Sequence, residues 1–326
     1  MKLLVSMGVP YKDVHKKNEG FRYNGAVVQF INWENKQVDN EIKYLSPVEN
    51  IGMGLSMMFK GAYRSGEDLW IVTNTEVLQY EMTNNKLVSV FSDPSFNDLH
   101  GVYVNNEEIY ICNTGLEIVQ CMNTKGEITN QWNIAEYPTW DRFDKEVDYR
   151  KIATTKPHEV HINHIFNLDG EMWVNLGSQR KAQSLDNKDR IIDLDSMFGV
   201  DEKVLCHDGL VKGDFIYFTS VNGSLVIVSK QTLKVEERID LNKSANLNKV
   251  IGWTRGCEVI GTKAYIGVSK MRHSKFKDYT KWIVKGDKVS LPSSILEVDL
   301  LTKDIVDIYE IENHSGAGVY SIIAVN

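Results

Sequence analysis

The sequence is poor in cysteine and has no long apolar run. Its 326 residues include four cysteines, none of them in CxxC spacing, which excludes a dense disulfide scaffold. No apolar stretch approaches the length that crosses a bilayer, and the stretch after Met1 is too short for a signal peptide. We therefore expect free thiols, a cytoplasmic protein and no membrane partner.

An excess of positive charge is also absent. The formal net charge is −7, which disfavours a nonspecific nucleic-acid binder held by a general positive field. The sequence contains no glycine-rich loop of the kind that cradles phosphates, so nothing in it supports a nucleotide cofactor. No low-complexity tract is present, and the 42% of hydrophobic residues suffices for a continuous core.

What the sequence does contain is a repeat. Each copy has a short apolar strand, a turn, a second strand with an aromatic residue between apolar neighbours, and two further strands. The central aromatic residues of five copies are Trp70, Tyr110, Trp173, Tyr217 and Tyr265. With a sixth copy at the ends of the chain, this pattern predicts an all-β fold, a six-bladed β-propeller formed by residues 1–326 as one domain.

The two ends of the chain read as parts of a single blade. Residues 318–323 resemble a lone first strand with nothing after it. Residues 2–6, 26–33 and 41–45 would supply the second, third and fourth strands of the same blade. Sharing a blade in this way closes the ring by hydrogen bonds and leaves only short edges.

Charged and imidazole side chains recur at the head of the predicted inner strands. They lie ten residues before the second-strand aromatic residue in three blades and nine residues before it in a fourth. These residues are His100, His164, His207 and Arg255. The inner strands of a propeller surround its central channel, so the three histidines are predicted to converge as ligands of a divalent metal ion, namely manganese, iron or zinc. The alternative is that they only hydrogen-bond to water and to backbone carbonyls in a wet channel.

Neighbours of these residues suggest catalytic roles. His207, Asp208 and Arg255 are the candidate catalytic residues, with Asp208 as a general base or as a group that orients a histidine. The segment 158–164 contains three histidines but lacks the spacing of the helical zinc-protease motif. On a strand His161 and His164 would point to opposite faces, and the register favours His164 as the residue in the channel.

Long loops between the strands are rich in basic residues. In a propeller such loops share one face, so we expect positive charge around the mouth of the channel and an anionic ligand there. Arginine suits carboxylate or phosphate groups, and aromatic rings can stack on a sugar or a base. The predicted substrate-binding residues are Arg180, Lys181, Lys270, Arg272 and Tyr279.

In its arrangement the repeat resembles bacterial six-bladed propellers, and among them the lactonase-like propellers. That resemblance implies a central calcium ion held by carboxylate and asparagine oxygens. This chain departs from the pattern because it has His100, His164 and His207 at the corresponding inner-strand heads, and imidazole suits manganese, iron or zinc better than calcium. Histidine-lined channels are similar to those of propeller polysaccharide lyases and carotenoid-cleaving oxygenases, although a basic, polar mouth does not favour a carotenoid.

Two functions of different classes follow from these residues. The first is an enzyme that acts on an anionic small molecule, such as a phosphorylated, nucleotide-linked or uronic-acid sugar, by metal-assisted hydrolysis or elimination. The second is a noncatalytic binding module or scaffold that presents a basic face to an acidic partner or glycan. The fold alone does not choose between them.

Overall fold

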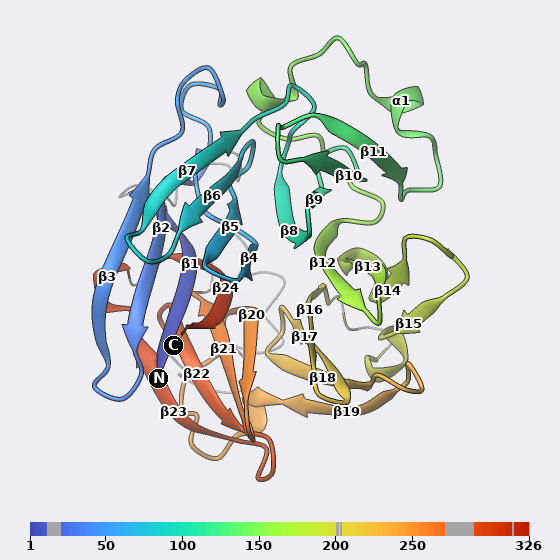
Figure 1. Ribbon diagram of the computed structural model, residues 1–326. Coiled ribbons are helices and arrows are strands. Elements are labelled where there is room, and N and C mark those ends of the chain that lie inside the picture. The colour runs from blue at the N-terminus through green and yellow to red at the C-terminus, as the bar shows by residue number, and fades with distance from the viewer. Residues whose placement is uncertain (12–20, 200–201, 203, 271–289, 315, 326) are drawn as a thin grey trace.

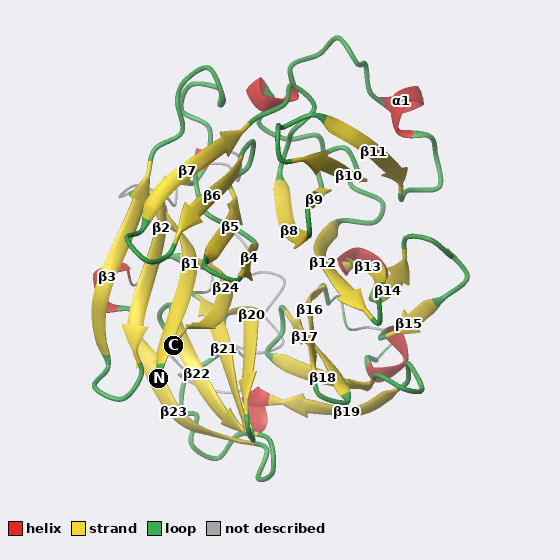
Figure 2. Cartoon of the chain, viewed as in Figure 1, coloured by secondary structure: helices red, strands yellow, loops and turns green. Residues whose placement is uncertain are grey.

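The chain forms a ring of β-sheets around a central axis (Figures 1 and 2). The computed structural model describes residues 1–11, 21–199, 202, 204–270, 290–314 and 316–325. Within these residues there are six sheets of four antiparallel strands each, which confirms the prediction of an all-β six-bladed propeller. None of the helices in this described part has the length and apolar character needed to cross a bilayer.

Each blade runs from an inner strand beside the channel to an outer strand at the rim. From inside to outside, three blades consist of β24 (Gly318–Val325), β1 (Lys2–Pro10), β2 (Tyr23–Asn32) and β3 (Gln37–Tyr44); β4 (Ala62–Ser65), β5 (Asp68–Val72), β6 (Val77–Glu81) and β7 (Lys86–Phe91); β8 (Leu99–Asn105), β9 (Glu108–Asn113), β10 (Ile118–Asn123) and β11 (Ile128–Asn133).

The other three blades complete the ring in the same order. They consist of β12 (Ile162–Leu168), β13 (Glu171–Leu176), β14 (Lys181–Ser184) and β15 (Ile191–Asp193); β16 (Cys206–Lys212), β17 (Phe215–Ser220), β18 (Ser224–Ser229) and β19 (Val235–Asp240); β20 (Trp253–Ile260), β21 (Lys263–Ser269), β22 (Ser294–Asp299) and β23 (Asp304–Glu310).

Helical structure in the described chain is confined to short segments in the connections (Figure 2). The helix α1 (Thr139–Arg142) and the 3₁₀ turn η3 (Tyr149–Lys151) lie in the long connection between β11 and β12. The remaining 3₁₀ turns are η4 (Gly177–Gln179), η5 (Asp195–Met197), η6 (Leu241–Lys243) and η8 (Glu312–His314).

The core lies between neighbouring blades rather than at one centre. The apolar side chains of adjacent sheets pack face to face, as Trp173 does between its own blade and the next, where it is fully buried. Alternating burial along the strands makes this packing possible, because successive side chains point to opposite faces of a sheet. Contacts between neighbouring inner strands run in a closed circuit through β4, β8, β12, β16, β20 and β24.

The first and last strands close the ring, as the sequence predicted. β1 pairs antiparallel with β24, with Leu4 opposite Ile323, and on its other side β1 pairs with β2. The N-terminal and C-terminal ends therefore lie side by side in one blade (Figure 1). The paired strands hydrogen-bond the ring shut, so the ring has no open edge at this junction.

Candidate functional site

Irregularities in the inner strands place polar side chains in the channel. A β-bulge shifts the register of β8 between Leu99 and Gly101, and another shifts that of β20 between Thr254 and Cys257. A bulge inserts an unpaired residue and re-aims its side chain, here His100 in β8 and Arg255 in β20. Tyr320 is placed in the same way, because the pairing of β24 with β1 skips it.

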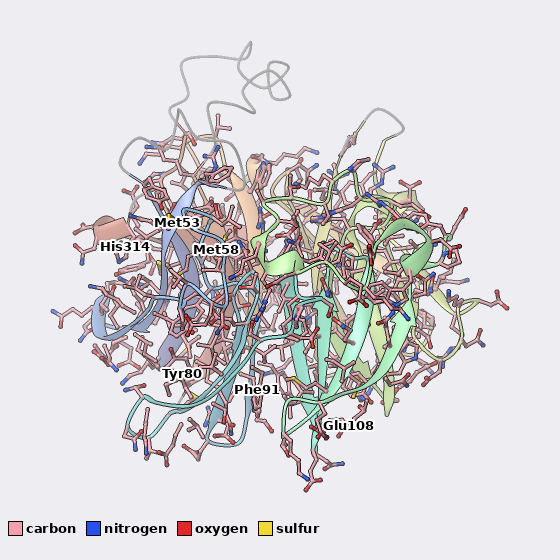
Figure 3. All side chains as sticks on the ribbon, turned by 90° about the horizontal axis from the view of Figure 1, so that it is seen from above. Met53, Met58, Tyr80, Phe91, Glu108 and His314 are labelled. Carbon is pink, nitrogen blue, oxygen red and sulfur yellow. The ribbon has the colours of Figure 1, made fainter. Side chains whose placement is uncertain are left out.

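These side chains line a cavity of about 460 Å³, which we call the channel-mouth cavity. Figure 3 shows Met58, one of its lining residues, on the opposite face of the ring from Glu108 at the start of β9. The polar lining comes from several blades. It includes Lys60, Asp98, His100, His161, His207 and Arg255.

Arg255 is the most unusual group in this cavity. Only 7% of the residue is exposed, and its guanidinium lies over the rings of Trp253 and Tyr320, at 5.0 Å and 4.8 Å from their centroids. Its Nε has no hydrogen-bond partner, and no carboxylate of the described residues forms an ion pair with it. Burying a charged group without a partner is costly, so this arrangement favours an anion that completes the site.

A second cation, Lys60, is already neutralised within the protein. Lys60 is 1% exposed, and its Nζ donates to the carboxylate of Asp98. Burial opposes ionisation of that carboxylate, but the Lys60 ammonium outweighs it, and the pKa of Asp98 lies well below its ordinary value. The Lys60–Asp98 pair therefore adds polarity to the cavity without net charge.

The three histidines of the cavity lie close together and are neutral. The ring of His161 lies 5.1 Å from that of His100 and 6.4 Å from that of His207, measured between centroids. Burial lowers the pKa of all three, to about 3 for His161 and well below the ordinary value for His100 and His207, and the charges of Lys60 and Arg255 act in the same direction. Neutral imidazoles can accept as well as donate hydrogen bonds.

The structure groups His161, not His164, with His100 and His207. The register of β12 and β13 puts Ile162 opposite Leu176 and His164 opposite Asn175, with Asn163 in a bulge between them. By the corresponding register of β8, the equivalent of His100 is therefore Asn163, and His164 corresponds to Gly101. The choice of His164, nine residues before Trp173, took the hairpin of this blade to be one residue shorter, but Phe166 lies opposite Trp173 as Tyr103 lies opposite Tyr110, so the two hairpins have the same length and the repeated position is Asn163.

His164 lines a second cavity of about 330 Å³. Along each of the six inner strands and the segment just before it, the residues that line this second cavity come after those that line the channel-mouth cavity, so the second cavity occupies the next level of the channel. Asp208 also belongs to it, although Asp208 directly follows His207. Burial raises the pKa of Asp208 to about 6, partly offset by hydrogen bonds from Thr219 and the Gly256 amide.

The predicted metal ligands thus lie at two levels of the channel. His100 and His207 face one cavity and His164 the other. Within the described ranges, no three histidine, cysteine, aspartate or glutamate side chains are arranged to hold a metal ion. The set of His100, His164 and His207 does not fit manganese, iron or zinc in this geometry, and no step of the proposed chemistry uses a metal.

The predicted substrate-binding residues lie elsewhere or outside the described chain. Arg180 pairs with the carboxylate of Asp195 and donates to a backbone carbonyl, and Lys181 begins the third strand of its blade. Lys270 is exposed after β21. None of these three lines the channel-mouth cavity. Arg272 and Tyr279 lie outside the described residues.

The cysteines are free and buried, as expected. Cys112, Cys121, Cys206 and Cys257 form no disulfide. Burial raises the pKa of Cys206 to about 12 and also raises that of Cys257, which keeps both as thiols at neutral pH. They act as small core residues, not as activated nucleophiles.

Fold and site together describe a six-bladed β-propeller with a polar, histidine-lined cavity at one level of its channel. No family model matches the chain, and no curated protein matches it either. Among solved structures, a chain in a crystal structure of a nidogen/laminin complex is similar, with a TM-score of 0.55, 9% sequence identity, and coverage of 99% of this chain and 97% of that chain. At this identity the similarity shows the fold alone.

Proposed function

We propose that the protein is an enzyme that binds a small anionic molecule in the channel-mouth cavity and acts on it by hydrolysis or elimination. The substrate class is a phosphorylated, nucleotide-linked or uronic-acid sugar. The observation that carries this proposal is the buried Arg255 guanidinium, which lines a cavity and has no carboxylate partner among the described residues. Arginine binds carboxylates and phosphates in a bidentate manner, which gives both affinity and orientation.

The aromatic surroundings of Arg255 support the same ligand class. The rings of Trp253 and Tyr320 both pack against the guanidinium and also line the cavity. Such rings present flat apolar faces next to the charged group, and a sugar or a base can pack on them. A ligand with an anionic group and a ring therefore matches this wall of the cavity.

The histidines supply the groups for acid–base chemistry. His100, His161 and His207 are neutral because burial lowers their pKa. An anionic ligand would bring the opposite charge next to these rings and raise their pKa toward neutrality, where proton transfer is most efficient. In either reaction one imidazole takes a proton, from water in hydrolysis or from carbon in elimination, and Arg255 stabilises the negative charge that develops on the substrate. The leaving group departs with the electron pair of the bond that breaks and takes up a proton from the imidazolium or from water.

The first test is ligand binding to variants of Arg255. We expect D-glucuronate and glucose 6-phosphate to bind to the wild type in isothermal titration calorimetry, and glucose to bind far more weakly. Loss of charge-assisted hydrogen bonds of about 1.5–3 kcal/mol should weaken anion binding by roughly 10- to 150-fold in Arg255→Met. Arg190→Met is the matched control, because the Arg190 side chain is 48% exposed and lies outside the cavity.

A second measurement separates the enzyme from the noncatalytic binding module. His207→Gln keeps a neutral polar side chain in the cavity but removes the imidazole. An enzyme should lose turnover of an identified substrate by at least about 100-fold in this variant while the protein stays folded. Anion binding that depends on Arg255, without turnover of any compound in the same class, would favour the binding module, and equal affinity of the wild type and Arg255→Met would refute the proposed site.

A further inference from the structure

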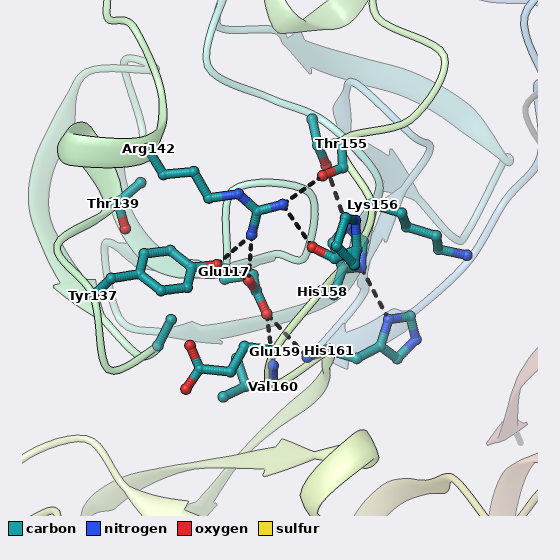
Figure 4. A network of polar contacts seen from close by, with 12 residues as sticks. Glu117, Tyr137, Thr139, Arg142, Thr155, Lys156, His158, Glu159, Val160 and His161 are labelled. Atoms are coloured by element: carbon teal, nitrogen blue, oxygen red, sulfur yellow. Dashed lines mark hydrogen bonds and ion pairs between the residues drawn. The ribbon is translucent and has the colours of Figure 1, made fainter.

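The segment that carries His161 is held by a buried ion pair (Figure 4). Glu117 is 0% exposed, and one of its carboxylate oxygens accepts from the backbone amide of Val160 at 2.6 Å. The other oxygen pairs with Arg142 at 3.1 Å and accepts from the hydroxyl of Tyr137. Arg142 also donates to the carbonyls of Thr155 and Pro157, at 2.8 Å and 2.6 Å. One ion pair therefore fixes both ends of the segment 155–161.

Within this segment a chain of hydrogen bonds leads from a backbone carbonyl to His161. The hydroxyl of Thr155 donates to the carbonyl of Gly115 at 2.6 Å, and its alternative acceptor, Oδ1 of Asn97, is 3.5 Å away. Oγ1 of Thr155 lies 3.2 Å from Nε2 of His158. Nδ1 of His158 lies 3.3 Å from Nδ1 of His161, and Figure 4 shows both contacts.

The directions of the hydrogen bonds in this chain follow from the Gly115 carbonyl at its end. A carbonyl only accepts, so the Thr155 proton points to Gly115, and Oγ1 accepts from Nε2 of His158. A neutral imidazole carries one proton, so Nδ1 of His158 accepts, and Nδ1 of His161 donates to it. Nε2 of His161 is left as a lone-pair nitrogen on a side chain that lines the channel-mouth cavity.

His100 also has its Nε2 as a lone-pair nitrogen, and in this ring a single hydrogen bond fixes the tautomer. Its Nδ1 lies 2.7 Å from the backbone carbonyl of Asp98 and must donate to it, so Nε2 of this neutral ring is also an acceptor. The cavity therefore has two distinct walls. Arg255 offers hydrogen-bond donors and a positive charge, and His100 and His161 offer acceptor nitrogens.

We propose that Thr155 and His158 are positioning residues that fix the Nε2 acceptor of His161, and that the cavity consequently selects an anion that also carries hydroxyl groups. The anionic group binds Arg255, and a hydroxyl donates to His161. A carboxylate without hydroxyl groups satisfies only the first wall. The choice of ligand rests on the proposed function, because it concerns the same cavity, whereas the tautomer of His161 does not.

The tautomer is tested in the free protein by long-range ¹H–¹⁵N NMR of the histidine rings at pH 7, with His161→Gln to assign the signal. We expect the proton of His161 on Nδ1. In Thr155→Val the acceptor for His158 is lost, so the population of the Nε2–H tautomer of His161 should rise. Thr155→Ser keeps the hydroxyl and should match the wild type. A proton on Nε2 in the wild type, or an unchanged tautomer in Thr155→Val, overturns the inference.

The ligand class is tested with a matched pair of carboxylates, D-glucuronate and cyclohexanecarboxylate. We expect Thr155→Val to bind D-glucuronate roughly three- to tenfold more weakly than Thr155→Ser, the loss of one neutral hydrogen bond, with no change for cyclohexanecarboxylate. Equal losses for both compounds overturn the selection by hydroxyl groups. If neither compound binds to the wild type while the tautomer is as expected, the proposed function and the ligand class fail and the positioning roles stand.

Discussion

At the scale of single residues, the site depends on polar groups that the protein satisfies internally and on one that it does not. Glu117 is buried and accepts from backbone and side chains on all sides, and Lys60 is paired with Asp98. Arg255 has no such partner among the described residues. The first two groups hold the framework of the cavity, and Arg255 is available for a ligand.

The importance of the buried ion pair can be measured with Glu117→Gln. Removing one partner of a buried pair typically costs about 3–5 kcal/mol, because the other charge stays without compensation. The pair here has a partly exposed member, Arg142, at 28% of its side chain, so we expect about 2–4 kcal/mol in the free energy of unfolding. Denaturation in guanidinium chloride measures this change.

The control for that experiment is Glu237→Gln. Glu237 pairs with Lys303 at the surface, where the Lys303 side chain is 53% exposed and the Glu237 side chain 31%, in contrast to the fully buried Glu117. Such pairs contribute about 1 kcal/mol or less. Equal losses in Glu117→Gln and Glu237→Gln would mean that the segment 155–161 is held by other contacts.

Individual residues also show how far the sequence could be interpreted. His100, His207 and Arg255 were predicted from their distance to a second-strand aromatic residue, and the structure places them in one cavity. Lys60 was missed although it lies ten residues before Trp70, the same spacing that identified His100, and Asp98 was missed because it lies two residues before that position in its own blade. The signals that could have found them are a lysine inside the apolar stretch 57–61 and an aspartate two residues before His100.

At the scale of elements, regular strands follow from the sequence and bulges do not. The apolar–aromatic trios fixed the second strands, and the complementary ends of the chain predicted the shared blade of β24 and β1. A bulge depends on the local fit between two strands, and it moves all following side chains by one position. Ten residues before Trp173 stands Asn163, so neither His161 nor His164 occupies the repeated position, and counting alone could not show that His161 reaches the channel-mouth cavity.

The strand that closes the ring should be more sensitive than a strand at the rim. Val5 in β1 is 0% exposed and lies opposite Ile322 of β24, whereas Val306 in the outer strand β23 is 46% exposed. We expect Val5→Ala to lower the free energy of unfolding by about 2 kcal/mol, because it leaves a cavity in a packed region. Val306→Ala should change it by less than about 0.5 kcal/mol.

Thermal and chemical denaturation of both variants measure the difference. The two substitutions remove the same atoms, so intrinsic strand preference is nearly matched and burial is what differs. Similar stabilities of the two variants would show that the junction of β1 and β24 is not a critical part of the ring.

At the scale of the whole molecule, the buried histidines make stability dependent on pH. Burial lowers the pKa of His161 to about 3 and that of His164 to about 4, and it also lowers the pKa of His100, His158 and His207. Between the ordinary histidine pKa of about 6.5 and these lower values, the unfolded chain binds protons that the folded chain does not. Stability is therefore fully present above about pH 6.5 and is lost as the pH falls.

Asp208 acts in the opposite direction, because burial raises its pKa to about 6 and the folded chain takes up its proton first. Between about pH 6 and 4, the proton that Asp208 binds in the folded chain therefore cancels the effect of one histidine on the pH dependence of stability. A histidine whose folded-state pKa lies below that range, such as His161 with a pKa of about 3, lowers the free energy of unfolding by about 1.4 kcal/mol per pH unit as the pH falls.

The measurement is the free energy of unfolding, obtained from chemical denaturation at pH 7, 6 and 5, for the wild type and His164→Gln. His164 lines the second cavity, and its ring takes no part in the hydrogen bonds that fix the acceptor nitrogens of His100 and His161. In the variant one proton fewer binds on unfolding over this pH range. Its free energy of unfolding should therefore change less steeply with pH than that of the wild type, by about 1.4 kcal/mol per pH unit. A wild-type stability that is constant from pH 7 to 5 would contradict this account.

The pairing of β1 with β24 has a consequence for biosynthesis. Lys2 lies opposite Val325, so the partner of the first strand emerges from the ribosome only after almost all of the sequence between them. At roughly 5–20 residues per second, β1 waits for its inner neighbour for about 15 s to a minute or more. During that time the inner edge of β1 offers unpaired backbone groups to other chains, so pairing with another nascent chain is the hazard that this closure creates until β24 is made.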